Sequence, residues 1–180
     1  MASLGHVALG LAAARFADGR LVTARLGPSM VAWSLLSLLP DADVIGFAFG
    51  VRYGDPWGHR GATHALAIAL AGGLVAFALA RIWAQRRPLA LGLLVAAVLA
   101  SHGLLDTLTD GGRGVALAWP LSLERYFAPW RPIPVAPIGL GFLSKRGLYC
   151  AAIELAMFLP FWAWALYPRA TSRSQAPHRR

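Results

Sequence analysis

Apolar residues fill long stretches of this chain, and the polar residues gather between them. A helix needs about 20 mainly apolar residues to cross the hydrocarbon of a bilayer. Three segments meet this requirement, at residues 61–83, 88–108 and 147–167. Together with two less regular segments, they predict an all-α fold, a polytopic membrane bundle of about 4–5 transmembrane helices.

The two less regular segments lie in the first third of the chain. Residues 28–50 are long enough to span a bilayer, but Pro40, Asp41 and Asp43 interrupt their apolar run. Residues 2–16 are short and contain a histidine, which leaves open a tilted span, a half-helix buried against the others or a signal-like segment. We expect a retained helix rather than a cleaved signal peptide, because no small-residue cleavage pattern follows the apolar part.

The loops predict an orientation. Three segments are basic, at residues 18–25, 81–87 and 169–180. Because basic loops favour the cytoplasmic side, residues 51–60 and the long segment 110–146 should lie at the outer face. The long segment is rich in Pro, Gly and Trp and predicts an ordered interfacial loop. One membrane-embedded domain over residues 1–168 would then precede a basic disordered tail over residues 169–180.

Composition agrees with a membrane protein. Hydrophobic residues make up 57% of the 180 residues and charged residues 14%, against about 45–50% and about 25% in soluble domains. The net charge of +9 would suggest nucleic acid in a soluble protein. We expect no nucleic-acid partner here, because the basic residues lie between apolar runs. The single cysteine, Cys150, excludes an internal disulfide and a site with several thiolates.

Histidines and aspartates nevertheless lie in or beside the apolar runs, where charged groups are costly. They are His6, His59, His64, His102, Asp41, Asp43, Asp106 and Asp110. In the predicted topology, the four stretches that carry most of them fall at the same membrane face. We therefore expect a single site.

Two motifs supply pairs of such residues. In SHGLLDTLTDGG, His102 and Asp106 are four residues apart and share one helix face. They would either bind one divalent cation or pair with each other. In GHRGATHAL, His59 and His64 flank Arg60, whose guanidinium suits a phosphate, a carboxylate or lipid headgroups.

A third motif, LLPDADVIG, places a proline before two aspartates. Pro40 disfavours a continuous α-helix, so we expect a break that lets Asp41 and Asp43 turn toward one point. Both would be metal ligands, or one a ligand and the other a base. Alternatively, the aspartates cap a second half-helix.

Carboxylates and imidazoles without thiolates suit Zn²⁺, Mn²⁺ or Fe²⁺, with Zn²⁺ favoured, in a centre of one or two ions. The candidate metal ligands are His6, Asp41, His64, His102 and Asp106. The candidate catalytic residues are Asp43, His59 and Arg60.

The same motifs, in order, resemble a known family. LGHVALG, LLPDADVIG, HRGATHAL, SHGLLDTLTDGG and WPLSLERYFAPWRPIP are similar to the YdjM-type family of bacterial inner-membrane proteins, over roughly residues 3–140. The resemblance implies a helical protein of the bacterial inner membrane with a His/Asp metal centre and metal-dependent hydrolase activity, and it leaves the substrate open. The matching functional positions are His6, Asp41, Asp43, His59, His64, His102 and Asp106.

Arginines in the long segment suggest the kind of substrate. With Arg60, we expect Arg125 and Arg131 to bind a phosphate beside the metal. The predicted reaction is attack of a metal-activated water on a phosphoester or similar bond, in a membrane lipid or in a small substrate near the membrane.

Two other functions stay open. A metal or proton transporter would need polar residues continuing to both membrane faces, and Glu154 is the conspicuous polar residue in the inner halves of the spans. A non-catalytic membrane metal-binding protein is the other alternative. The pattern fixes no oligomeric state.

Overall fold

A computed structural model describes residues 3–21 and 25–168, and this part of the chain is a bundle of helices. The expected tail at residues 169–180 lies outside the described residues. The helices in chain order are α1 (Leu4–Ala17), α2 (Leu26–Leu38), η1 (Leu39–Phe49), η2 (Ala62–His64), α3 (Leu66–Ile82), α4 (Pro88–Thr107), η3 (Gly139–Leu143), α5 (Lys145–Met157) and α6 (Leu159–Leu166). Two isolated bridges are the only extended pairing within the described ranges, so the all-α prediction is confirmed.

Two helical segments are long and apolar enough to cross a membrane. They are Leu26–Phe49, which joins α2 to η1 over 24 residues, and α4, which has 20 residues. The pair α5 and α6 counts as a third only if its 65° bend is taken as a broken span. The shorter apolar helices α1 and α3 have 14 and 17 residues. The structure therefore has two or three candidate spans, with shorter helices beside them.

Two expected spans differ in detail. The helix expected over residues 61–83 begins only at Leu66, because the short η2 precedes it and Ala65 is extended. The helix expected over residues 147–167 is divided between α5 and α6. Pro160 accounts for this division, since it lacks an N–H and its ring would clash with the carbonyl of Ala156 in a continuous helix.

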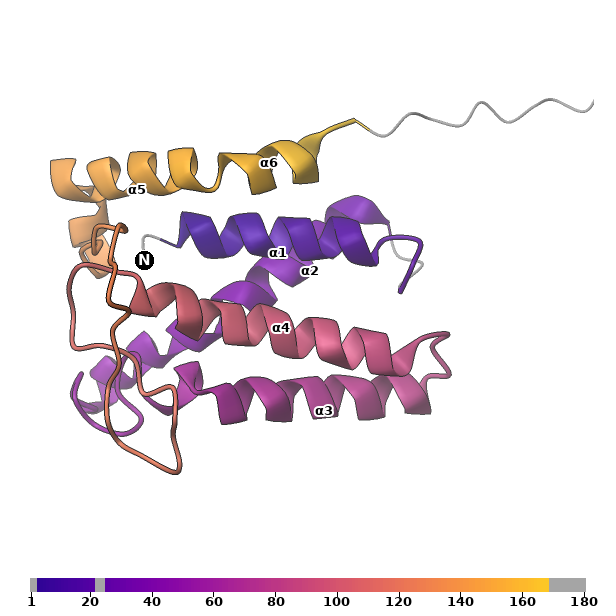
Figure 1. Ribbon diagram of the computed structural model, residues 1–180, viewed down its shortest axis with the longest axis horizontal. Helices are drawn as coiled ribbons and strands as arrows, with labels where there is room; N and C mark the ends of the chain where they lie inside the picture. Colours follow the sequence, from indigo (N-terminus) through magenta and orange to yellow (C-terminus); the bar gives the residue numbers. More distant parts are fainter. Residues whose placement is uncertain (1–2, 22–24, 169–180) are drawn as a thin grey trace, which may run out of the picture.

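Small residues bring the helices into close contact. A Cβ at Gly10 of α1 would lie 2.7 Å from Cα of Ser34 in α2, and one at Gly73 of α3 would lie 2.7 Å from the carbonyl oxygen of Gly92 in α4. Such close backbone approach is a common way of packing helices in membranes. α3 and α4 lie side by side, with α1 on the other side of α4 and α5–α6 beyond α1 (Figure 1).

The segment between α4 and η3 folds over one end of the bundle, at the left of Figure 1. Its backbone bonds to the end of α4: the N–H of Ala128 donates to Thr107 at 2.9 Å, and that of Ile133 donates to Leu108 at 3.2 Å. Val115 and Tyr126 pair within it. The long loop is thus ordered, and it lies at the end where α1 begins and α4 ends.

Candidate metal centre

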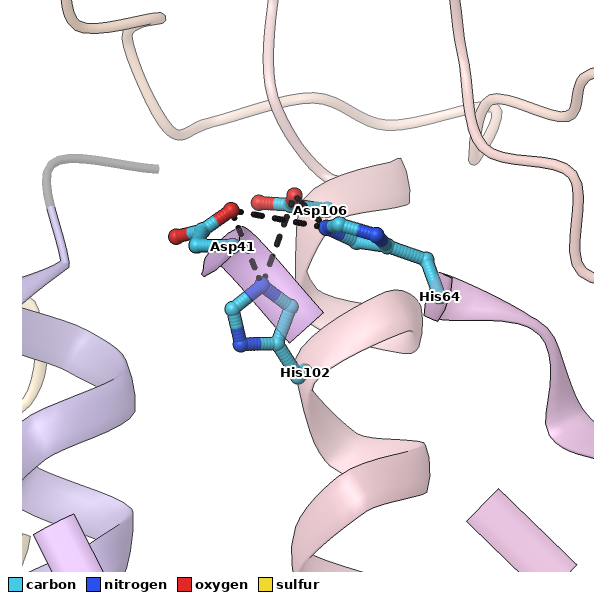
Figure 2. Close-up of side chains that lie close together, drawn as sticks. All are labelled: Asp41, His64, His102 and Asp106. Carbon is cyan, nitrogen blue, oxygen red and sulfur yellow. Dashed lines mark ion pairs between the residues drawn. The ribbon is translucent and has the colours of Figure 1, made fainter. Parts of the chain in front are cut away.

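Four side chains from three separate helices converge at the covered end of the bundle (Figure 2). Asp41 comes from η1, His64 from η2, and His102 and Asp106 from α4. Oδ1 of Asp41 lies 3.3 Å from Nε2 of His102 and 3.5 Å from Nε2 of His64. Oδ2 of Asp106 lies 3.5 Å from Nε2 of His64 and 3.9 Å from Nε2 of His102. Two nitrogens and two oxygens thus surround one point.

The spacing of these four atoms fits a divalent ion. Four ligands at about 2.0–2.1 Å from a tetrahedral ion are about 3.3–3.4 Å from one another. Three of the four printed separations lie at 3.3–3.5 Å and the fourth is 3.9 Å. The His102–Asp106 pair is the longest of the four, so this pair is not a closed ion pair of its own. These four separations are compatible with one ion held by four ligands.

The hydrogen bonds of the two imidazoles leave the inward nitrogens without a partner. Nδ1 of His102 lies 2.6 Å from the carbonyl oxygen of Ser37, to which it donates. Nδ1 of His64 lies 3.0 Å from Oγ1 of Thr63. Nε2 is buried in both rings and has no hydrogen-bond partner. Metal-binding histidines typically donate their other N–H in this way, so the donor set fits a cation held between these rings and the facing carboxylates.

The 3₁₀ geometry of η1 decides where its aspartates face. As expected, the α-helix does not continue through Pro40: α2 ends at Leu38, and the chain goes on directly as the 3₁₀-helix η1. A 3₁₀-helix has 3.0 residues per turn, which places Asp41 and Asp43 about 120° apart. Both nevertheless reach His64: Oδ1 of Asp41 lies 3.5 Å from its Nε2, and Oδ2 of Asp43 lies 3.3 Å from its Nδ1. In this pattern Pro40 is the residue that would donate to Ser37, and it has no N–H, so this carbonyl is available to His102.

Gly103 allows η2 to lie directly against α4. A Cβ at this position would collide with the carbonyl oxygen of His64. Any larger residue would therefore push His64 away from His102 and Asp106. The glycine between the two ligands of α4 is part of the geometry of the centre.

Asp43 organises a second group beside the first. Its Oδ1 lies 2.8 Å from Nδ1 of His59. Its Oδ2 accepts from the backbone N–H of Arg60 at 3.1 Å and from the hydroxyl of Thr63 at 2.8 Å. Asp43, His59 and His64 could also hold an ion by their mutual distances. However, both oxygens of Asp43 already accept hydrogen bonds, which suits a carboxylate that orients His59.

His6 lies against the centre but outside the group of four. Its ring stacks on His102 with centroids 3.6 Å apart, and its Nε2 lies 3.6 Å from Oδ1 of Asp106. Glu154, which the sequence placed apart from the other polar residues, accepts from the backbone N–H of Gly5 at 3.1 Å. Glu154 therefore holds the start of α1, and with it His6, at the same end of the bundle.

Arg60 is buried and forms an ion pair with a residue of the centre, Asp106. Its Nε lies 3.2 Å from Oδ2 of Asp106, and its Nη1 donates to Thr109 at 2.8 Å and to Gly111 at 3.1 Å. The cluster as a whole has three carboxylates (Asp41, Asp43 and Asp106) and one guanidinium. With neutral histidines its net charge is −2, which one divalent cation would balance.

A cavity of about 300 Å³ opens beside the centre. Its polar and charged lining includes Asp41, Tyr53, His59 and Arg60. Burial raises the pKa of the Tyr53 phenol, which keeps this side chain neutral as a donor. Asp41 is the only one of the four converging residues that reaches this cavity among the residues described.

The other two arginines do not reach the cavity. Arg125 donates to the backbone carbonyls of His59, Tyr53 and Asp55 at 2.9, 3.1 and 3.1 Å, and burial lowers the pKa of its guanidinium. Arg131 is exposed and lies over the ring of Phe127. Neither residue lines the cavity in the described structure, and the binding of a phosphate by Arg125 and Arg131 stays a prediction.

Some residues of the centre have no signal in the sequence. Thr63 and Thr109 connect His64 and Arg60 to their surroundings through single hydroxyl groups. Ser37 contributes only its backbone carbonyl. Tyr53 lines the cavity from a loop. No spacing rule singles out such residues, although Thr63 lies directly before a candidate ligand.

Fold and site together define a helical membrane protein with a buried His/Asp cluster at one end of its bundle. Residues 1–174 match the family of the YdjM inner membrane protein. The chain belongs to this family, which confirms the resemblance seen in its motifs. It is 42% identical over 160 residues to the inner membrane protein YbcI of Escherichia coli (strain K12), with 88% of each chain covered. No solved structure gives a significant match.

Proposed function

We propose that this protein is a membrane-bound metal-dependent hydrolase that cleaves a phosphoester or a similar bond. The observation that carries the proposal is the convergence of Asp41, His64, His102 and Asp106, with two unpartnered ring nitrogens facing two carboxylates beside a cavity. Nitrogen and oxygen donors in a four-coordinate arrangement favour Zn²⁺ over Mn²⁺ or Fe²⁺. The net charge of −2 favours one ion over two.

Held by Asp41, His64, His102 and Asp106, a divalent ion would supply a water of lowered pKa and would polarise a phosphoryl oxygen. His59 is the candidate base, since it lines the cavity and its Nδ1 is held by Asp43 at 2.8 Å. Asp43 would fix the orientation of this imidazole and stabilise its protonated form. The division of roles is therefore Asp41 as ligand and Asp43 as the residue that positions the base.

Arg60 supports a negatively charged substrate. Of the three arginines proposed from the sequence to bind substrate, it alone lines the cavity among the described residues. Its Nη1 is occupied by Thr109 and Gly111, so the contribution to an anion is the fixed charge of a buried guanidinium. A positive charge in this lining stabilises the charge that develops on a phosphoryl group.

Transport is less well supported. In the described part of the chain, the buried ionisable side chains all belong to the covered end of the bundle: His6, His59, Arg60, His64, His102, Asp106 and Glu154. A conduction route would need such groups along the length of the helices. A purely metal-binding role requires neither the cavity nor the Asp43–His59 pair, whereas hydrolysis uses both.

The proposed location is the inner membrane, with several spans and with the metal centre toward the periplasm. Arg20, Arg86 and Arg87 lie together around a hollow at the opposite end of α1 and α3. Basic residues favour the cytoplasmic side, so the centre would face outward.

The test is metal analysis and hydrolysis by the purified full-length protein. We expect about one Zn²⁺ per chain, its loss in His102→Ala and Asp41→Ala, and cleavage of phosphoesters but not of amides or carboxylic esters. Wild-type protein that holds no metal and ignores added metal would overturn the metal centre. Metal-loaded protein that cleaves only amides or carboxylic esters would overturn the phosphoester assignment.

A further inference from the structure

The residues that line the cavity beside the metal centre are of two kinds. Four are polar or charged: Asp41, Tyr53, His59 and Arg60. A larger set has apolar side chains: Val44, Val135, Ala136, Pro137, Ile138 and Phe142. A small hydrophilic substrate does not match the apolar part of this lining, because its polar groups would have no partners there.

The apolar part of the cavity lining is continuous in sequence with exposed apolar residues. Ile138 lines the cavity and is also 49% exposed, so it forms part of the rim. Next to it in η3, Leu140 and Leu143 are 89% and 73% exposed. Apolar side chains exposed in this way mark a surface that contacts lipid or another apolar partner. The cavity thus opens toward an apolar surface, over residues 138–143.

The size of the cavity limits what it encloses. Its volume of about 300 Å³ is at the lower end of the range for ligand pockets. It therefore accommodates a headgroup and the beginning of a hydrocarbon chain, but not a long chain. The remainder of such a chain would pass the rim at Ile138 and lie on the exposed surface beside Leu140.

We propose that the substrate is a lipid phosphate, whose phosphate lies at Arg60 and Asp41 and whose chain leaves past Ile138 and Phe142. The inference rests on the proposed hydrolase function and decides between a membrane lipid and a small water-soluble substrate. In the reaction a water oxygen bonds to phosphorus as the bond from phosphorus to the ester oxygen breaks. The proton removed from the water passes to the leaving oxygen, and the products are inorganic phosphate and a lipid alcohol.

The experiment compares three phosphomonoesters of glycerol: dioleoyl phosphatidate, dihexanoyl phosphatidate and glycerol 3-phosphate, which has free hydroxyl groups in place of the acyl esters. Full-length, metal-loaded protein is assayed in mixed detergent micelles. We expect kcat/KM to rise at least tenfold from the glycerol ester to the dioleoyl ester. In Ile138→Asn and Phe142→Ser this preference should fall at least tenfold, mainly through KM for the long-chain ester.

Leu121→Asn is the matched control, since Leu121 is 95% exposed and does not line the cavity. It should keep the wild-type preference. Metal content equal to that of the wild type would show that the rim variants remain folded.

Two failures are distinguishable. Equal kcat/KM for all three esters, unchanged by the rim variants, would overturn the lipid inference and leave the hydrolase standing. Cleavage of none of them would overturn hydrolysis of phosphomonoesters. Equilibrium binding of dioleoyl phosphatidate then decides the lipid inference alone: binding weakened at least tenfold by Ile138→Asn supports it, and binding unaffected by this variant overturns it.

Discussion

His102 of α4 donates from Nδ1 to the carbonyl oxygen of Ser37 in α2, at 2.6 Å and across 65 residues of chain. This bond fixes the ring in the tautomer that turns the lone pair of Nε2 toward Asp41. It also joins the two helices that pass most clearly as membrane spans. A single hydrogen bond therefore both holds two helices of the bundle together and sets the tautomer of a candidate metal ligand.

Removing this ligand should abolish metal binding. In His102→Ala we expect less than one tenth of the metal content of the wild type, measured by elemental analysis. Metal at 100 times its Kd should stabilise the wild type by about 2.7 kcal/mol and the variant not at all. Glu124→Gln changes an exposed carboxylate that accepts a hydrogen bond from the hydroxyl of Tyr126, and it should retain the metal. Equal metal content in His102→Ala and the wild type would contradict the assignment of this ligand.

Asp43→Asn tests whether Asp43 positions the base His59 or is itself a metal ligand. Asp43 holds His59 but has both oxygens occupied by hydrogen bonds. We therefore expect the variant to keep its metal while kcat falls by about 10²–10⁴, the usual contribution of a positioned general base. Loss of metal together with activity would instead make Asp43 a ligand, and would favour a second ion.

Gly103→Ala tests the close approach of η2 to α4. The added methyl group would meet the carbonyl of His64 and displace its ring. We expect metal affinity to fall by at least about tenfold, with helix content by circular dichroism unchanged because alanine favours helix. Leu104→Ala, at the next position of α4 and on a side chain 48% exposed, is the control. Wild-type metal affinity in Gly103→Ala would contradict the claim that contact with Gly103 positions His64 for metal binding.

Cysteine labelling in intact cells tests the orientation. A thiol in Glu124→Cys lies in the long loop over the metal centre, and one in Arg86→Cys lies at the opposite, basic end. A membrane-impermeant maleimide applied from outside, with the outer membrane permeabilised, should label the first and not the second. Native Cys150 is fully buried and should stay unlabelled. The reverse pattern would place the centre at the cytoplasmic face.

The sequence was a good guide where one helix or one motif decides the outcome. The four-residue spacing of His102 and Asp106 places both on one face of α4, as helix geometry requires. The alternation of helix direction brings His6, Asp41 and His64 to the same end. These inferences depend only on helix periodicity and on the order of the segments, and both can be read directly from the chain.

The sequence was a poor guide where tertiary partners compete. Arg125 resembles a substrate-binding residue, but three backbone carbonyls of a distant loop bind its guanidinium. Pro40 predicted the end of the α-helix, but not that a 3₁₀-helix follows and sets Asp41 and Asp43 against the two ring nitrogens of His64. Glu154 is far from the other polar residues in the sequence, but in the fold it accepts a hydrogen bond from the backbone of Gly5 in α1. In each case the decisive contact crosses many residues of chain, and no local pattern reports it.

The four converging side chains come from three separate elements, η1, η2 and α4. Their donor atoms meet only when α2, α3 and α4 are packed as in the intact bundle. Metal content would therefore serve as an internal standard for sample quality during extraction and purification. A detergent that loosens the helices would release the ion well before it unwinds them, and that release would be seen before circular dichroism changes.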